Sequence, residues 1–341
     1  MEKEEYIQKE SFFKIRSYTS CFKKGFELYI RNFKLLFKLL WLPILFSALI
    51  QTAFVYFMQT IPQTNITVNL PSLLIIGGIL LILWLFINCF KFGTLFSIFN
   101  KYKEDGVIPT TRFKTLKNDI FHYSCRTLKF DLWVILYLII ASAMIVFIFF
   151  AIKQGLGVRS TGIMGYLICL FTGLLIMLFH LVVFNIPMIY VGMRYMMGNE
   201  GFLKSFIKSY KIAFRHWGAI FALSLITSIV TVGIVLLLNM PEYILLIVRR
   251  LSTASIEFGD TAGLPQGFVI FSLIVIFLCS FLQVYVGLFY YFPMLFQYAS
   301  IESDVLERQE QDKLNAKEDY DTMTSLASKK KYEEENFIYR S

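Results

Sequence analysis

The stretch VVFNIPMIYVGMRY, residues 182–195, closes a long run from Thr161 to Met193 that contains no Asp, Glu, Lys or Arg. Soluble cores are interrupted by charge far more often than this, and an apolar segment of about 20 residues is enough to cross a bilayer. These runs therefore decide the fold class. Four other segments are equally free of charged residues: 39–90, 132–152, 217–241 and 261–301.

The runs predict an all-α, polytopic membrane protein with six transmembrane helices. The run 39–90 is too long for one crossing, and its polar segment QTIPQTNITVNLPS, residues 59–72, carries two prolines that divide it. Overall, 57% of the residues are hydrophobic and 17% are charged. The predicted spans are 39–58, 73–99, 132–152, 162–193, 217–238 and 267–300.

The distribution of basic residues predicts the orientation. Segments before the first span and in alternate loops contain 22 Lys and Arg residues, whereas the three opposite loops contain four. Basic residues collect on the cytoplasmic side of a membrane. The first 38 residues are charged throughout and contain no apolar signal-peptide core. We expect a multi-pass membrane protein with both termini in the cytosol.

Three tryptophans indicate an internal repeat. Trp41, Trp133 and Trp217 each lie near the start of an odd-numbered span, after a basic segment whose apolar residues recur at helical spacing. Such segments are typical of amphipathic helices that lie in the headgroup plane, although each could instead pack on the protein itself. The predicted units are a cytosolic tail 1–11, repeat units 12–102, 103–195 and 196–301, each an in-plane helix plus two spans, and a charged tail 302–341.

The basic faces of these segments are the candidate lipid-binding surface. Anionic lipid attracts a well-placed Lys or Arg by about 1 kcal/mol. Lys91 is added because it lies near the inner boundary of its span, from which its ammonium is expected to reach a phosphate. The candidate headgroup contacts are Lys23, Lys24, Arg31, Lys34, Lys91, Lys204, Lys208, Lys211 and Arg215.

Two prolines near the inner ends of long spans, Pro187 and Pro293, are predicted to be helix kinks rather than ligand sites, because proline removes a backbone hydrogen bond. Three polar residues, Asn88, His180 and Gln283, fall at comparable depths of the three long spans. Polar groups in hydrocarbon normally face the bundle interior. This polar layer either holds the repeats in register through hydrogen bonds or lines a path or headgroup pocket.

No pattern of a catalytic or metal site is present. The sequence lacks HExxH, paired CxxC, GxSxG and nucleotide-binding glycine motifs, and its five cysteines are scattered singly. Of the three histidines, His122 and His216 lie on the cytosolic segments, and neither has an obvious carboxylate or cysteine partner at metal-ligand spacing. We therefore expect no enzyme, no cofactor, no metal and no nucleic-acid partner.

Two basic segments, CFKKGFELYIRNFKLLFKLLWLP (21–43) and KSFIKSYKIAFRHWGAIFALSLI (204–226), carry a resemblance. With them, roughly residues 12–300 resemble a group of six-helix bacterial membrane proteins of mostly unassigned function, which includes the membrane region found beside glycerophosphodiester phosphodiesterases. No phosphodiesterase catalytic domain is present in this chain, so the resemblance implies no site residues. It does imply a location in the bacterial cytoplasmic (inner) membrane.

These features predict a non-enzymatic membrane protein that engages anionic lipid and scaffolds a membrane or cytosolic partner. The tail 302–341 is expected to be largely disordered, with a helical start near 304–317. It is the candidate docking site for a membrane or cytosolic protein partner. Transport or export of a lipid-like solute is the alternative, and the lack of buried Asp, Glu or Arg in the spans argues against it. An envelope stress or immunity protein is a further alternative.

Overall fold

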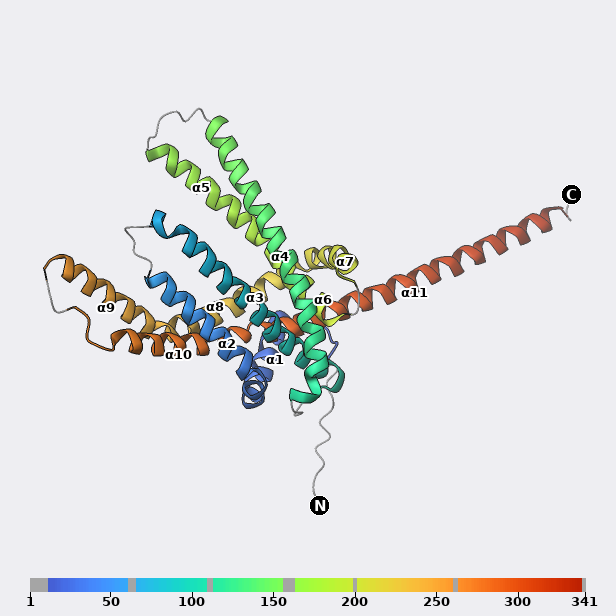
Figure 1. Ribbon diagram of the computed structural model, residues 1–341. Helices are drawn as coiled ribbons and strands as arrows, with labels where there is room; N and C mark the ends of the chain where they lie inside the picture. Colours follow the sequence, from blue (N-terminus) through green and yellow to red (C-terminus); the bar gives the residue numbers. More distant parts are fainter. Residues whose placement is uncertain are drawn as a thin grey trace, which may run out of the picture.

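The computed structural model describes residues 12–60, 66–108, 113–155, 163–198, 201–259 and 263–338, and within these ranges the chain is almost wholly helical, without strands (Figure 1). The predicted tail 1–11 lies outside the described residues. The helices are α1 (Tyr18–Arg31), α2 (Phe33–Thr60), α3 (Ile66–Asp105), α4 (Phe113–Gly155), α5 (Ile163–His180), the π-helical turn η1 (Leu181–Asn185), α6 (Ile186–Met197), α7 (Phe202–Arg215), α8 (Trp217–Leu238), α9 (Met240–Glu257), α10 (Phe268–Leu288) and α11 (Tyr291–Ile338).

Six helical stretches are long and apolar enough to cross a membrane, which confirms the number of spans. Most of their surface is not covered by protein, as expected of helices surrounded by lipid tails. The stretches are Phe33–Phe57, Ile75–Asp105, Leu116–Met144, Phe171–Met197, Trp217–Leu238 and Phe268–Thr324.

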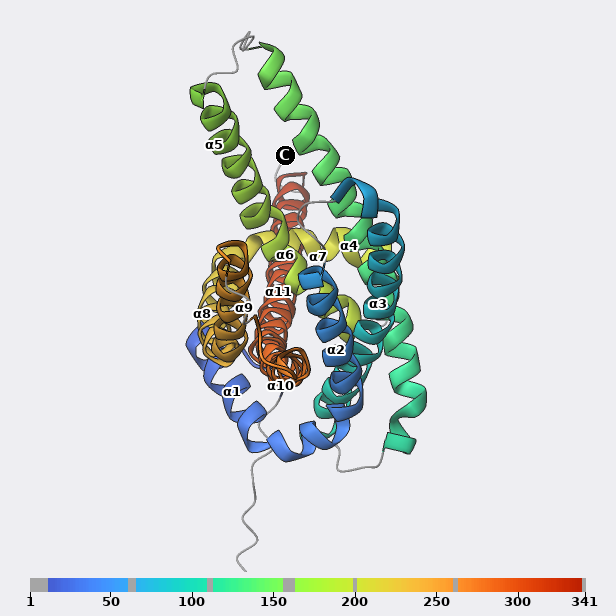
Figure 2. The ribbon, with the colours of Figure 1, turned by 60° about the vertical axis from the view of Figure 1, so that its left-hand side comes forward.

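The spans are arranged as three helical hairpins that diverge from a common centre. Figure 1 shows α2 with α3, α4 with α5, and α8 and α9 with α10 pointing away from the region where α1, α6, α7 and the start of α11 meet. Figure 2 shows the same separation from another side. The largest fully buried side chains, among them Phe99, Phe292, Leu36 and Met196, lie in this central region, which we call the hub.

Helices from different parts of the chain interlock at the hub. α1 packs on α11, the first half of α4 packs on α3, and α7 packs on α6. Backbone comes very close at Gly25 of α1, where a Cβ atom would lie 2.4 Å from the backbone nitrogen of Pro293. Gly93 of α3 has a similar role, since its Cβ would lie 2.8 Å from the nitrogen of Ser124 in α4. Glycine therefore permits backbone-to-backbone contact at two of these junctions.

α1 and α7 end at nearly identical corners. Each has 14 residues, and the residue that joins it to the following span, Asn32 or His216, has φ near −105° and ψ near 15°. The Asn32 side chain donates to the Leu28 carbonyl at 2.9 Å, which satisfies one of the carbonyls freed at the helix end.

The prediction of a separate in-plane helix before Trp133 is wrong. α4 runs without interruption from Phe113 to Gly155, so that basic segment is the first part of a membrane-crossing helix. No glycine or proline occurs between 113 and 154, and no other breaker stops the helix there.

The two prolines predicted as kinks lie just after interruptions between helices. Pro187 is the second residue of α6 and follows the π-helical turn η1. Pro293 is the third residue of α11, after the non-α-helical residues Phe289 and Tyr290. Helices commonly bend at π-helical turns and at breaks of this kind, and in the turn that follows the missing N–H of proline costs little. The positions of Pro187 and Pro293 therefore suit the predicted kinks, which stay predictions.

The prediction of a largely disordered tail is also wrong. α11 continues through 302–338 as one helix that projects from the hub (Figure 1). The segment contains no glycine or proline and is rich in good helix formers such as Glu, Lys, Gln, Leu and Ala. An i,i+4 ion pair, Arg308 to Asp304 at 2.8 Å, supports its start.

Candidate functional site

The surfaces of α1 and α7 are the first candidate site. On α7 the residues turned toward the protein are small: Ser205, Ser209 and Ala213 are buried. The large apolar residues Leu203 and Ile207 are 62% and 75% exposed. A soluble helix would bury the large side chains and expose the small ones, so the reverse arrangement points to an apolar environment outside the protein.

α1 repeats this arrangement in register. Its buried residues Cys21 and Gly25 precede Ser205 and Ser209 by the same number of positions, and Phe26 and Ile30 are exposed. Tyr29 is the exception, because it is buried and its hydroxyl donates to the Tyr285 carbonyl at 3.0 Å. We call the exposed apolar residues of α1 and α7, with their neighbouring lysines and arginines, the amphipathic surface.

The structure leaves most predicted headgroup residues accessible. On α1, α2 and α7 these side chains are exposed, apart from Lys24, which is half-buried. The exposed set is Lys23, Arg31, Lys34, Lys204, Lys208, Lys211 and Arg215.

Lys91 is a correction, because it is only 9% exposed. Its ammonium donates to Asn88 Oδ1 at 2.6 Å and lies 4.8 Å from the centre of the Phe92 ring. Lys91 is thus bound inside the protein and does not reach the headgroup region as predicted.

The three residues of the predicted polar layer have separate partners. Asn88 accepts from Lys91, His180 bonds the Tyr137 hydroxyl at 2.8 Å through Nε2, and Gln283 accepts from Gln51 at 3.1 Å. Each contact links neighbouring helices or turns, and the structure does not bring the three residues together.

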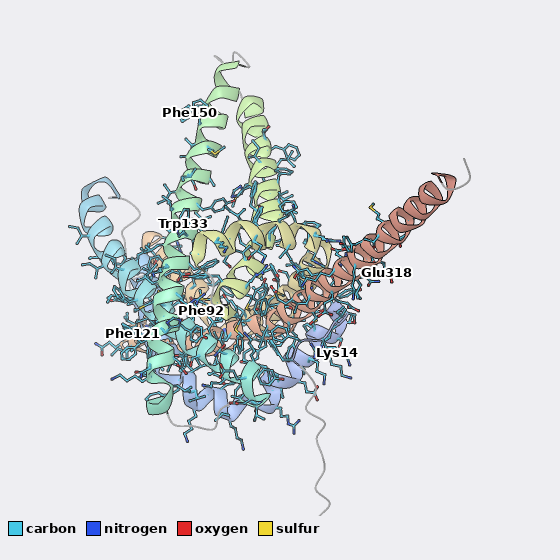
Figure 3. The ribbon with its side chains drawn as sticks, turned by 90° about the vertical axis from the view of Figure 1, so that its right-hand side faces the viewer. Lys14, Phe92, Phe121, Trp133, Phe150 and Glu318 are labelled. Atoms are coloured by element: carbon cyan, nitrogen blue, oxygen red, sulfur yellow. The ribbon has the colours of Figure 1, made fainter. Side chains whose placement is uncertain are left out.

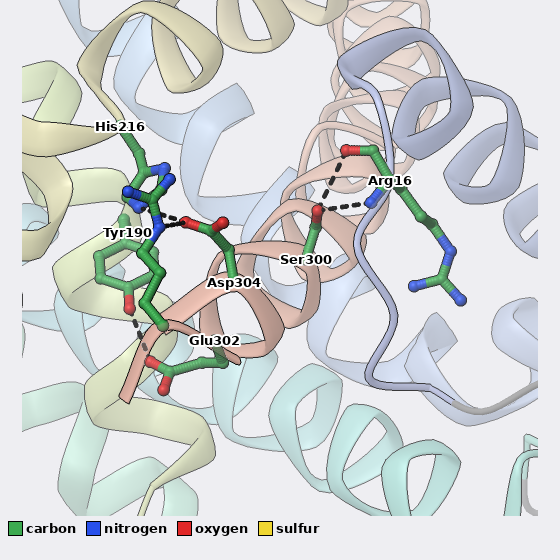
Figure 4. Close-up of polar contacts among 7 residues, drawn as sticks. Arg16, Tyr190, His216, Ser300, Glu302 and Asp304 are labelled. Carbon is green, nitrogen blue, oxygen red and sulfur yellow. Dashed lines mark hydrogen bonds and ion pairs between the residues drawn. The ribbon is translucent and has the colours of Figure 1, made fainter. Parts of the chain in front are cut away.

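A polar cluster at the hub was not predicted. Glu302 of α11 accepts from the Tyr190 hydroxyl at 2.6 Å and lies 3.2 Å from Nε of Arg194. Two residues further on, Asp304 lies 3.3 Å from Nε2 of His216 (Figure 4). Burial lowers the pKa of His216, and the nearby Asp304 carboxylate only partly offsets this effect. No local sequence pattern indicates these contacts, because the residues that meet are up to 112 positions apart in the chain.

The same cluster includes the start of the described chain. Figure 4 shows the backbone of Arg16 against Ser300, whose hydroxyl accepts from the Arg16 N–H at 2.8 Å and donates to its carbonyl at 3.1 Å. The cluster therefore joins the segment before α1 to α6, α8 and α11.

A cavity of about 240 Å³ is a second candidate site. It lies between α3, α4, α6 and the α10–α11 junction, and the acidic residue Asp131 lines it. Asp131 is half-buried and belongs to the stretch Leu116–Met144, which is long and apolar enough to cross a membrane, although it lies outside the predicted span 132–152. Asp131 directly precedes the charge-free run 132–152. The predicted span begins at the first residue of that run, so it leaves Asp131 out.

Within the described ranges, no three His, Cys, Asp or Glu residues are grouped so as to hold a metal ion. Comparison with protein-family models, with curated proteins and with solved structures gives no match.

Proposed function

We propose that this chain is a multi-pass protein of the bacterial inner membrane, with both termini in the cytosol, that binds anionic lipid through the amphipathic surface and scaffolds a membrane partner. The proposal assigns no reaction to the chain. The observation that carries it is the orientation of α7, which buries Ser205 and Ser209 while it exposes Leu203 and Ile207 beside Lys204 and Lys208. An apolar face flanked by lysines suits the boundary between acyl chains and phosphates.

The proposal includes a threefold architecture of the chain. Its support is the packing at the hub, where the beginning of each unit contacts the end of another: α4 on α3, α7 on α6, and α1 on α11. This order closes a ring of three units. The matching corners at Asn32 and His216 also favour it.

A membrane-bound scaffold also needs a surface for its partner, and α11 offers one. Beyond the hub this helix is exposed, with Leu306, Leu314 and Tyr320 accessible among charged residues. We expect a partner to bind there, and deletion of residues 310–341 to abolish that binding without changing lipid retention.

Lipid binding is tested by native mass spectrometry of the protein in mixed phosphatidylglycerol and phosphatidylcholine nanodiscs. Lys204→Gln with Lys208→Gln removes two exposed charges four residues apart on α7. Each well-placed lysine contributes about 1 kcal/mol toward anionic lipid, so retained phosphatidylglycerol should fall by roughly tenfold or more.

The matched control is Lys313→Gln with Lys317→Gln, another exposed i,i+4 pair, on the projecting part of α11. This control should retain phosphatidylglycerol as the wild type does. Equal retention by both double variants would contradict the proposal, as would a wild-type protein that does not prefer phosphatidylglycerol.

A further inference from the structure

Asp131 lies in the wall of a cavity that is otherwise largely aromatic and apolar. Phe92 of α3, Phe130 of α4, Met188 of α6 and Tyr291 of α11 contribute to the same wall. A volume of about 240 Å³ is enough for several water molecules or a small polar group. A carboxylate is costly in such surroundings unless a positive charge or several donors accompany it.

The carboxylate of Asp131 has hydrogen-bonding capacity to spare. Within the described ranges, the hydrogen bond found for it comes from the Cys89 thiol, at a sulfur-to-oxygen distance of 3.8 Å. A thiol is a weak donor, and an ionised carboxylate has about four acceptor positions. Lys91 is within electrostatic range, but its ammonium donates to Asn88 and does not line the cavity.

Three other polar groups of the cavity wall already have partners. The Thr127 hydroxyl donates to the Tyr123 carbonyl, and the Tyr137 hydroxyl bonds His180. The hydroxyl of Tyr290 bonds that of Ser224 at 2.8 Å. Asp131 is therefore the charged group of the wall that is best placed to bind a ligand.

A second, almost wholly apolar cavity of about 320 Å³ adjoins the first. The two share Tyr137 and Met188 in their walls, and the second extends between α4 and α7 past Trp133 and Phe206. Figure 3 labels Phe92 and Trp133, which belong to the first and the second cavity respectively. A chamber with one carboxylate in its wall, next to an almost wholly apolar chamber, matches the two ends of an amphiphile.

We propose that the paired cavities bind an amphiphilic amine, with its protonated amine at Asp131 and its apolar body in the chamber between α4 and α7. An ammonium group donates to a carboxylate through strong, charge-assisted hydrogen bonds, and the aromatic residues Phe130 and Tyr291 line the same cavity and can add cation–π attraction. An anionic head would be repelled by Asp131. This inference uses neither α1 nor the lysines of the amphipathic surface, so it does not depend on the proposed function.

The direct test is calorimetric titration of the full-length protein, in a maltoside detergent at neutral pH, with decylamine and with decanol. The two probes have the same alkyl chain, and only the amine carries a charge. Asp131→Asn keeps the side-chain shape and removes the charge, and Asp312→Asn makes the same change at an exposed site on α11. Hydrogen bonds to charged groups justify an expected loss of about tenfold or more in decylamine affinity for Asp131→Asn.

The proposal predicts that decylamine binds the wild type and Asp312→Asn with equal affinity, and Asp131→Asn at least about tenfold more weakly. Decanol should bind the wild type no more tightly than decylamine binds Asp131→Asn. Unchanged decylamine affinity of a folded Asp131→Asn protein would overturn it, and so would equal affinity of the wild type for both probes. If Asp131→Asn does not fold, Met188→Trp serves as the second variant. It fills the junction of the cavities and leaves the charge, so undiminished decylamine binding to it also overturns the proposal.

The amine can belong to a lipid headgroup or to a free amphiphile, and phosphatidylethanolamine nanodiscs distinguish these sources. Retention of phosphatidylethanolamine that depends on Asp131 in native mass spectra assigns the site to a lipid headgroup. Decylamine binding that depends on Asp131, without such retention, assigns it to a free amphiphilic amine.

Discussion

At Gly25 the backbone of α1 comes very close to another part of the chain. A methyl group there would lie 2.4 Å from the nitrogen and 2.6 Å from the Cα of Pro293, and backbone atoms cannot turn aside. We expect Gly25→Ala to lower the free energy of unfolding by about 1–3 kcal/mol, although alanine favours a helix. Thermal unfolding in detergent measures the change. Gly233→Ala is the control, because nothing lies within 4 Å of its added methyl group and its stability should be unchanged or slightly higher.

The lowered pKa of His216 predicts how the stability of the folded protein depends on pH. Its pKa is lowered in the folded protein, chiefly by burial, and the nearby Arg308 and Arg215 add to this effect against the attraction of Asp304. Below the ordinary histidine pKa of about 6.5, the unfolded chain therefore binds a proton more readily than the folded chain. Stability should fall as the pH decreases from about 6.5 through the lowered pKa.

The measurement is the unfolding midpoint of wild type and His216→Gln at several pH values between neutrality and mild acid. The substitution should make the wild-type decrease shallower. A wild-type protein that gains stability over this interval, relative to His216→Gln, would show that the ion pair with Asp304 outweighs burial and would contradict the expectation.

At the scale of elements, the sequence predicted what depends on local pattern. The six spans follow from charge-free runs, and the helices now seen as α1 and α7 follow from apolar residues at helical spacing beside lysines. The uninterrupted α4 was not predicted, because its basic first half resembles those helices and local sequence does not distinguish the two cases. Asp131 was missed for a related reason: charge marks the edge of a hydrophobic run, whereas the helix continues through it.

The projecting part of α11 allows a sharp test of helical order. Spin labels at the exposed positions Glu307 and Leu326 lie 19 residues apart. At a rise of 1.5 Å per residue, a continuous helix gives a narrow distribution of distances between the two labels, centred at about 28 Å. Double electron–electron resonance of the protein in nanodiscs measures it. A broad distribution of the kind given by a flexible chain would support the disordered tail predicted from charge and polarity instead.

At the scale of the whole molecule, the hub contacts explain what a single sequence could not predict. Glu302 meets Tyr190 and Arg194, and Arg16 meets Ser300 across 284 positions of the chain. Such contacts depend on how the three hairpins pack together at the hub, and the local periodicity of the sequence does not predict that packing. The pairing of the two cavities has the same origin, since their walls come from separate hairpins.

The arrangement predicts which positions share one side of the membrane. Lys14 and Glu318 lie on the hub side of the three hairpins (Figure 3), whereas Phe258 follows α9 at the tip of one hairpin and is 92% exposed. Single cysteines at these positions, in a protein whose exposed Cys125 is replaced by serine, should react differently with a membrane-impermeant maleimide. In intact cells Phe258→Cys should be labelled, and the other two should react only after the membrane is opened. Labelling of Lys14→Cys in intact cells would reverse the orientation.

The central claim, that α7 lies in the headgroup plane, is tested most directly by the depth of Ile207. A spin label in its place, in vesicles containing phosphatidylglycerol, is compared with one at Lys208 by power saturation with oxygen and with a water-soluble nickel complex. The account predicts that the Ile207 label is accessible to oxygen, shielded from nickel and about 5–10 Å below the phosphates, while the Lys208 label is accessible to nickel. Equal access of nickel to both labels would place α7 in water and contradict the claim.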